Sequence, residues 1–262
     1  MKPRIAVTAD VGKTPDAYVR AVQKAGGNPF VLQPLESGPP PANRLADADG
    51  LLLAGGRDLD PALWGETKHP KTRLMDPRRQ EADLALLEEA NARGLPVLAV
   101  CLGIQELAVY RGGTLIQHVP DVPNAARHDG TTQHPVTHVV TIEADSLLAR
   151  IVGPEPASTA GPPAARSRKA DEAGGPLETN SRHHQAVREP GRGMRIVARS
   201  ADGLIEAVES EDRSRFGLGV QWHAEDLISE PRHLALFKAL CEWARAYASE
   251  RRGDEPSRPA SA

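Results

Sequence analysis

The sequence predicts an α/β protein with a mostly parallel central sheet covered by helices on both faces, plus a smaller antiparallel strand set. Three observations lead to this prediction. Short apolar segments alternate with helical patterns through the first half of the chain. One of them, Pro96–Val100, is apolar throughout, as strands buried inside parallel sheets are. In the second half, short strands separated by tight turns are typical of antiparallel pairing.

The first half supplies the strand–helix–strand repetition that builds a parallel sheet. Its helices are bounded by recognisable signals: Pro15 at a first position after a Thr14 cap, glycines at 26–27, and Gly94 as a stop. The elements expected here are strands Arg4–Thr8, Pro29–Leu32, Gly50–Ala54 and Pro96–Val100, and helices from Thr14 to Gly26 and from Arg79 to Arg93.

The second half is expected to contribute four more strands and a final helix. In Val136–Ile142 the alternation puts Val136, His138, Val140 and Ile142 on one face. The other strands are Met194–Arg199, Gly203–Glu209 and Phe216–Trp222. The helix begins near Pro231, and its buried face is expected to carry Leu234, Phe237, Leu240, Cys241 and Ala244.

Two stretches fall outside this pattern. Residues 153–176 are rich in Pro, Ala, Gly and charge, and we expect a surface insertion there. The polar tail, residues 251–262, is expected to be disordered. We therefore expect one domain over residues 1–250.

Composition excludes several classes of function. With 262 residues and 40% hydrophobic side chains, the chain can bury one large core. A net charge of −3 with scattered positive charges argues against a nucleic-acid partner. No apolar run is long enough to cross a membrane, and the first residues lack a signal-peptide pattern. We expect a cytoplasmic protein whose two cysteines, Cys101 and Cys241, are free thiols.

Cys101 is the candidate nucleophile. It follows the apolar strand directly and precedes a helical pattern, so its side chain should project from the carboxyl edge of the sheet. Ala99 and Gly103 supply the small neighbours that such a tight strand–turn–helix elbow needs. The helix N-terminus behind the sulfur favours the thiolate. A lone cysteine is more often structural; the combination of strand, small neighbours and helix favours catalysis.

His223 and Glu225 are the candidate base and its orienting carboxylate. They end an apolar strand, and a spacing of two puts both side chains on the same side of an extended segment. A thiolate mechanism needs a histidine that can protonate the leaving amine, held by a carboxylate. An isolated His-x-Glu is usually a surface pair. The catalytic interpretation of His223 and Glu225 therefore depends on their place at the end of a strand and downstream of Cys101.

A metal site was weighed against this triad. His183, His184, His223 and Glu225 include zinc-ligand types, but they lack a helical His-x-x-x-His or a Cys-x-x-Cys spacing. Adjacent histidines in an extended strand would also point to opposite faces. We therefore expect no metal.

An oxyanion formed during attack on an amide needs backbone N–H donors. Gly55–Gly56 follows the strand Gly50–Ala54, and glycine lets the backbone approach an oxygen closely. The amides of Gly56 and Leu102 are the expected donors, although a glycine pair can equally be an ordinary turn.

Four segments resemble the class I glutamine amidotransferases, and more narrowly the gamma-glutamyl-gamma-aminobutyrate hydrolase family of putrescine catabolism. They are Leu51–Pro61, Ala99–Leu107, Asn180–Val187 and Gln221–Glu225. The resemblance implies a flavodoxin-like three-layer sandwich and hydrolysis of a gamma-glutamyl amide through a glutamyl-thioester. It implies neither a metal nor an organic cofactor. It also suggests Gly55, Gln105, His184 and Gln185 as substrate-binding residues.

Several positions depart from that family's pattern. Leu102 stands where the narrower family often has Arg, while Ala54 and Ala224 replace prolines. No reacting group is lost. The segment Arg78–Asp83 matches the family's pattern only loosely, and the insertion at 153–176 precedes the His-His-Gln segment, so together these departures leave the specificity for the leaving amine open. A glutaminase that donates ammonia to a separate synthase, and an idle binding protein on the same fold, stay open as alternatives. The expected partner is a small gamma-glutamyl substrate, and a homodimer is left open.

Overall fold

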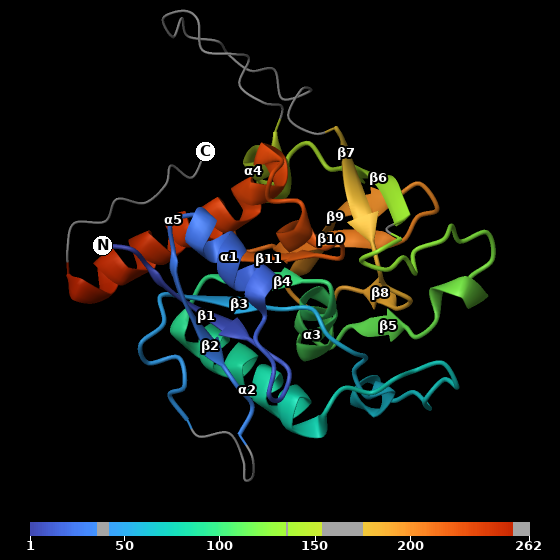
Figure 1. Cartoon of the computed structure of the whole chain (residues 1–262), viewed down its shortest axis with the longest axis horizontal. Helices are drawn as coiled ribbons and strands as arrows, with labels where there is room; N and C mark the ends of the chain where they lie inside the picture. The colour runs from blue at the N-terminus through green and yellow to red at the C-terminus, as the bar shows by residue number, and fades with distance from the viewer. Residues whose placement is uncertain (36–41, 135, 154–174, 254–262) are drawn as a thin grey trace, which may run out of the picture.

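The structure, a computed structural model, describes residues 1–35, 42–134, 136–153 and 175–253. A twisted mixed sheet runs through the molecule with helices on both sides of its parallel part (Figure 1). The order of strands is β2-β1-β3-β4-β11-β10-β9-β6-β7, with β8 pairing to β10 and β5 to β8. This is the predicted α/β fold.

The parallel part holds five strands. They are β1 (Arg4–Thr8), β2 (Asn28–Leu32), β3 (Gly50–Leu53), β4 (Val97–Val100) and β11 (Gly217–Val220). β4 pairs in parallel with β3 on one side and with β11 on the other, and every residue of β3 and β4 is buried. A strand covered on both faces must be apolar throughout, which explains the sequence of this segment.

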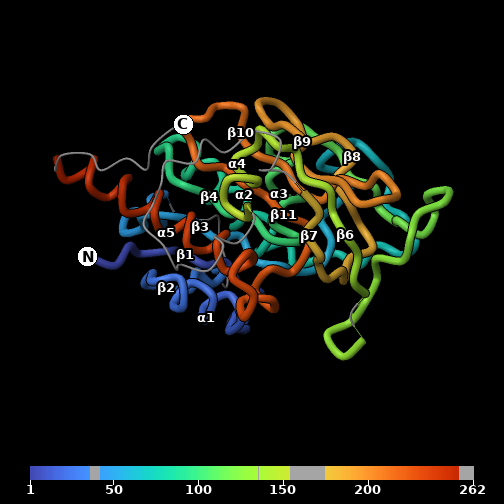
Figure 2. The backbone as a smooth tube through the Cα atoms, turned by 90° about the horizontal axis from the view of Figure 1, so that it is seen from above, coloured from blue at the N-terminus to red at the C-terminus, as the bar shows by residue number. Residues whose placement is uncertain are grey.

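The antiparallel part extends the sheet beyond β11. It comprises β10 (Ile205–Ser210), β9 (Met194–Ser200), β6 (Val136–Ile142), β7 (Pro176–Ser181), β8 (Ala186–Glu189) and β5 (Thr114–Ile116). Figure 2 shows β6, β7, β8 and β9 at the end of the molecule opposite β1, β2 and α1. Along β6 the four residues predicted to share a face are the less exposed ones, as expected.

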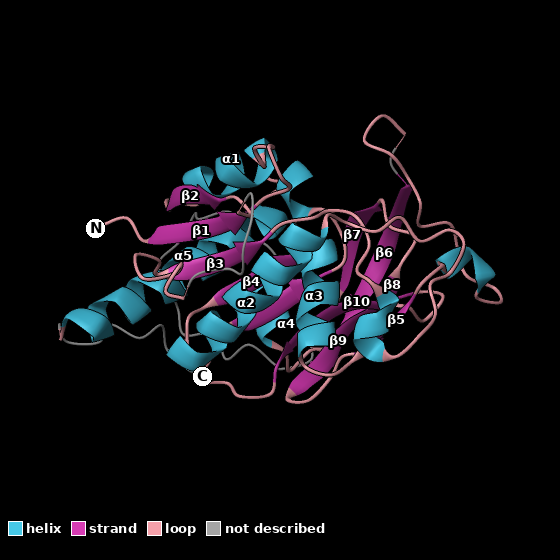
Figure 3. Ribbon diagram, turned by 90° about the horizontal axis from the view of Figure 1, so that it is seen from below, coloured by secondary structure: helices cyan, strands magenta, loops and turns pink. Residues whose placement is uncertain are grey.

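Two apolar clusters fill the spaces between sheet and helices. One packs α1 (Asp16–Lys24), α4 (Leu147–Val152) and α5 (Pro231–Arg252) on the sheet, and the other packs α2 (Pro77–Arg93) and α3 (Leu102–Tyr110) on its opposite face. Figure 3 shows the molecule from below, with α2 and α3 lying over the strands around β4. Leu234, Phe237, Leu240, Cys241 and Ala244 are all buried, as predicted for the last helix. None of the helices in the described ranges is long and apolar enough to cross a membrane.

Several boundaries differ from the prediction. The first helix begins at Asp16, so Thr14 does not cap it. Pro15 stands at the cap position, and no side chain makes a cap hydrogen bond there. The second helix begins two residues early, because the carboxylate of Asp76 accepts from the amide of Arg78 and so caps it. β5, β7, β8 and α4 were missed, since they are short and their pattern depends on tertiary partners.

The expected insertion and tail fall mostly outside the described residues. Of 153–176, Gly153 ends α4 and Pro176 begins β7, and 154–174 are not described. Of 251–262, Arg251 and Arg252 belong to α5, so the predicted start of the tail was too early there. Residues 254–262 are not described.

Candidate active site

Cys101 occupies a strained turn between β4 and α3. Its φ of 56° lies in the left-handed region that side chains rarely adopt. The amide of Cys101 donates to the carbonyl oxygen of Val220 at 2.9 Å, which ties the turn to the neighbouring strand β11. At Gly103, a Cβ would lie 2.7 Å from the carbonyl oxygen of Leu53, so the predicted small neighbour is sterically required. The elbow therefore has the expected form.

Gln221 contacts the sulfur and was not assigned a role from the sequence. Its Nε2 lies 3.9 Å from Sγ of Cys101 as a long hydrogen-bond donor, and its Oε1 accepts from Nε2 of Gln105 at 3.2 Å. Nε2 of Gln105 also lies 3.2 Å from the carbonyl oxygen of Gln185. All three glutamines are buried. Gln105 is thus linked to the sulfur through Gln221, and its role in binding a substrate stays a prediction.

His223 and Glu225 meet as predicted, but in a different backbone conformation. β11 ends at Val220, and His223 precedes the short 3-10 helix η4 (Ala224–Asp226). The pair lies in this turn instead of an extended strand, and Nδ1 of His223 is 2.6 Å from Oε1 of Glu225. Asp226, at the end of the turn, pairs with Arg182 at 2.6 Å.

Asn180, in β7, holds the main chain of His223 from both directions. The amide of His223 donates to Oδ1 of Asn180 at 2.8 Å, and Nδ2 of Asn180 donates to the carbonyl oxygen of His223 at 3.1 Å. The sequence motif contained Asn180, yet only the structure shows that it faces a residue 43 positions later. The antiparallel part of the sheet therefore positions the imidazole.

Cys101 and His223 both lie beside Gly55. A Cβ on Gly55 would lie 3.2 Å from Cε1 of His223 and 3.6 Å from Cβ of Cys101. Cys101 acts on the imidazole both through its charge and through a side-chain hydrogen bond. Burial alone would lower the pKa of His223, but the charges of Cys101 and Glu225 raise it to about 10. The ring of His223 is therefore held as an imidazolium beside the sulfur.

Tyr18, from α1, lies against the same pair and was also missed. Its hydroxyl accepts from the amide of Gly55 at 2.9 Å and lies 3.5 Å from Nδ1 of His223. Burial, with Glu225 and Cys101 nearby, raises the pKa of Tyr18 well above its usual range, so the phenol stays neutral. A single tyrosine in an amphipathic helix gives no sequence signal of such a contact.

A buried arginine fixes the loop after β3. Arg79, 1% exposed, donates through Nη2 to the carbonyl oxygen of Ala54 at 2.9 Å and through Nη1 to that of Gly55 at 3.2 Å. Asp10 and Asp83 balance its charge at 2.6 and 3.0 Å. At Gly56 a Cβ would lie 2.7 Å from Cδ2 of Leu102, so these two residues adjoin. Within the described residues, neither the Gly56 amide nor the Leu102 amide donates a hydrogen bond.

His184 and Gln185 lie on the wall next to this centre. Nε2 of His184 is 3.0 Å from Oδ2 of Asp58, and its Nδ1 is 3.2 Å from Nδ1 of His118. Nε2 of Gln185 donates to the carbonyl oxygen of Gln117 at 3.2 Å. Gln117 and His118 also line a pocket of about 730 Å³ together with charged side chains, namely Glu66, Lys68, Asp121 and Arg188. No contact joins His184 to the sulfur itself among the described residues.

Two groups of side chains in the described ranges could hold a metal ion. One is His223, Glu225 and Asp226, and the other is His128, His183 and Glu206. In the first group Nδ1 of His223 is already bonded to Glu225.

The chemical groups around Cys101 are those that cysteine-dependent acyl transfer needs, namely a thiol, an imidazole, a carboxylate and free amides.

Comparison with known proteins gives the family of this chain. The family profile described as Peptidase C26 matches residues 5–225. Protein NtpR of Enterococcus hirae is 36% identical over 218 residues, which cover 81% of each chain. A gamma-glutamyl-gamma-aminobutyrate hydrolase of Escherichia coli O157:H7 is 32% identical over 218 residues, which cover 80% of this chain and 77% of that protein.

A solved glutamine amidotransferase from Thermotoga maritima shares the fold. It has a TM-score of 0.53 at 17% identity, with 95% of this chain and 98% of the other covered. The family match spans the elbow at Cys101 and ends at Glu225, so both halves of the site lie within it. This chain therefore belongs to the Peptidase C26 family and has a class I glutamine amidotransferase-like fold.

Proposed function

We propose that this chain hydrolyses gamma-glutamyl amides of small amines, of the gamma-glutamyl-gamma-aminobutyrate kind, through a glutamyl-thioester on Cys101. The observation that carries the proposal is the strained elbow at Cys101, beside the imidazole of His223. The charge of Cys101 helps to raise the pKa of this imidazole to about 10. A thiolate beside an imidazolium is the reactive form of a cysteine nucleophile.

The reaction follows from these positions. Sγ of Cys101 attacks the amide carbonyl carbon, and the C–N bond then breaks while His223 protonates the departing amine. Because Glu225 holds Nδ1, the other ring nitrogen, Nε2, is left for this proton transfer. Water, deprotonated by His223, next attacks the thioester and releases glutamate and the free thiol.

The amides of Gly56 and Leu102 are the proposed oxyanion donors. Both are free of other hydrogen bonds among the described residues, and their side-chain positions adjoin. Arg79 binds the carbonyl oxygens of Ala54 and Gly55, which orders the loop before the reaction begins. Donors that are already placed need no reorganisation when charge develops.

The substrate contacts are proposed on the same wall. Gln185 has a buried Oε1 without a partner in the described part of the chain, which suits the ammonium of a glutamyl group. Gly55 and Gln105 would line the glutamyl side, and His184 the side of the leaving amine. The adjacent pocket of about 730 Å³ carries both signs of charge, so it can take an amine with a polar or charged tail.

The test is glutamate release from a panel of gamma-glutamyl amines, with free glutamine alongside. We expect kcat/KM to be higher for gamma-glutamyl-gamma-aminobutyrate and related conjugates than for glutamine, and Cys101→Ser to lose both activities. Faster turnover of glutamine would favour the ammonia-donating alternative. An absence of turnover on every member of the panel would favour the idle binding protein.

A further inference from the structure

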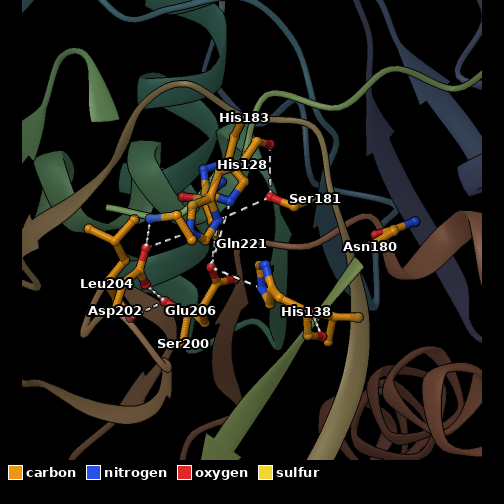
Figure 4. Close-up of polar contacts among 12 residues, drawn as sticks. His128, His138, Asn180, Ser181, His183, Ser200, Asp202, Leu204, Glu206 and Gln221 are labelled. Carbon is orange, nitrogen blue, oxygen red and sulfur yellow. Dashed lines mark hydrogen bonds and ion pairs between the residues drawn. The ribbon is translucent and has the colours of Figure 1, made fainter. Parts of the chain in front are cut away.

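A second cluster of titratable side chains is buried in the antiparallel part of the sheet, away from the mechanism just described. Glu206 in β10 is fully buried, and three histidines surround it: His128 before β6, His138 in β6 and His183 after β7 (Figure 4). His128 and His183 are 2% and 5% exposed. The cluster therefore joins three separate segments of chain around one carboxylate.

The distances are those of ligands around one ion. Oε1 of Glu206 lies 3.6 Å from Nδ1 of His128, 3.3 Å from Nε2 of His138 and 3.6 Å from Nε2 of His183. Donor atoms about 2.1 Å from a tetrahedral zinc ion are about 3.4 Å from one another. At these separations neither carboxylate oxygen of Glu206 makes a hydrogen bond within the described residues.

His183 and His128 each make a hydrogen bond on the side of the ring away from Glu206. This bond turns the other ring nitrogen toward the carboxylate of Glu206. Nδ1 of His183 lies 2.9 Å from the carbonyl oxygen of Gln185, so this nitrogen carries a proton, and in the neutral ring Nε2 presents a lone pair. Nε2 of His128 likewise donates to Oδ2 of Asp202 at 2.9 Å. Nδ1 of His128 then faces Glu206 and Oγ of Ser181, and that hydroxyl gives its proton to the carbonyl oxygen of His128 at 2.8 Å.

In their neutral forms these two rings would present lone pairs to a buried carboxylate, an arrangement that a cation or a ring proton between them stabilises. Histidines that bind a metal through one ring nitrogen usually donate from the other to a carboxylate or a carbonyl oxygen. Glu206 in contact and Asp202 behind His128 supply two negative charges, which balance a divalent ion. Imidazole nitrogens with one carboxylate suit zinc-type ions better than calcium or magnesium.

A route to this cluster exists from the surface. A pocket of about 360 Å³ is lined by His128 and His183 together with Val119, Pro120, Arg127 and Asp129. The pocket is not lined by Glu206, whose carboxylate oxygens are buried, so an ion would enter past the rings of His128 and His183.

We propose that His128, His183 and Glu206, joined by His138, form a buried structural site for Zn²⁺. The ion fastens β6, β7 and β10 together behind the active site. The amide of Gln221 donates to the carbonyl oxygen of Glu206 at 2.8 Å, and the chain continues from His183 directly into His184 and Gln185. The resemblance noted from the sequence implies no metal, and this proposal departs from it; it is independent of the proposed hydrolase activity.

The experiment measures metal directly. Full-length protein, purified without immobilised metal, is analysed by elemental mass spectrometry before and after dialysis against a chelator. We expect about one zinc per chain, a lower thermal midpoint after its removal, and recovery on addition of ZnCl₂. Cobalt(II) added to the stripped protein should give the visible absorption bands of a four-coordinate site.

Variants locate the ion. Glu206→Gln and His183→Ala should lose stoichiometric zinc, and Asp202→Asn should weaken zinc binding by about 10- to 100-fold because it acts through His128. His134→Ala, an exposed histidine, and Cys101→Ser should keep the zinc. Stripped wild-type protein that binds no added Zn²⁺ would mean a network of protonated histidines and would overturn the site. If Cys101→Ser lost the zinc and His183→Ala kept it, the ion would lie at the sulfur, and the proposed site would again be overturned.

Discussion

Asn180 and His223 are joined by two hydrogen bonds, one in each direction, between a side-chain amide and a main chain 43 residues later. β7, at the far edge of the antiparallel part of the sheet, thereby fixes the backbone of the proposed base. The Nδ1 contact of His223 with Glu225 at 2.6 Å fixes the ring itself. The imidazole is thus restrained at both ends before any substrate binds.

Removing this restraint should slow the chemical step. For Asn180→Ala we expect kcat to fall by about 10- to 100-fold with a smaller change in KM, because a displaced base is less able to transfer the proton. Asn180→Asp keeps the acceptor Oδ1 but loses the donor, so its loss should be smaller. Equal losses in both variants, or a change confined to KM, would contradict a positioning role.

Gly55 lies beside Tyr18, Cys101 and His223, and a methyl group there should disturb all three. In Gly55→Ala the new Cβ would lie 2.7 Å from the Tyr18 hydroxyl and 3.2 Å from Cε1 of His223. We expect kcat/KM to fall by about 10- to 100-fold. Gly175→Ala is the matched control, since nothing lies within 4 Å of its Cβ, and it should keep full activity. Steady-state kinetics with circular dichroism to verify folding decide the result.

The two cysteines should differ sharply in reactivity. Cys241 is fully buried, and burial raises the pKa of its thiol to about 11. A chloroketone analogue of glutamine should therefore label Cys101 and leave Cys241 unmodified, as read by intact-mass and peptide mass spectrometry. Cys241→Ser should label like the wild type, and Cys101→Ser should not label. Labelling of Cys241 at a comparable rate would remove the nucleophile assignment.

The charge on Cys101 should be visible in the titration of His223. The pKa of His223 is raised from 6.5 to about 10, chiefly by Cys101 and Glu225 working against burial. Because the folded pKa is raised, this interaction stabilises the protein fully below pH 6.5, and the stabilisation is lost as the pH rises through about 10. We expect activity to fall over the same alkaline range, as the imidazolium loses the proton that the leaving amine needs.

Variant titrations test the cause. In Cys101→Ala the pKa of His223, followed by the NMR shift of its Cε1 proton, should be clearly lower than in the wild type, and Glu225→Gln should lower it as well. The alkaline loss of thermal stability should shrink in both variants. An unchanged imidazole titration in Cys101→Ala would show that the sulfur and the ring do not interact.

The sequence by itself determined the fold class and the elbow. A short apolar run such as Pro96–Val100, bounded by a glycine and a turn, is typical of a strand buried inside a parallel sheet. The small residue at Gly103 reflects a turn that tolerates nothing larger, as its close approach to Leu53 shows. These are local constraints, so local residues record them. The same holds for His223 and Glu225, which are two positions apart and meet at 2.6 Å, although in a turn and not in the extended segment expected.

Only the tertiary structure decided which distant residues complete each site. Tyr18, Arg79, Asn180 and Gln221 reach the region of Cys101 from four different elements, and His128, His183 and Glu206 converge from segments up to 78 positions apart. A side chain's contacts across a sheet depend on strand order and register, which hydrophobic periodicity does not encode. For the same reason His183 and His184, adjacent in the chain, face different partners: His183 turns to Glu206 and His184 to Asp58.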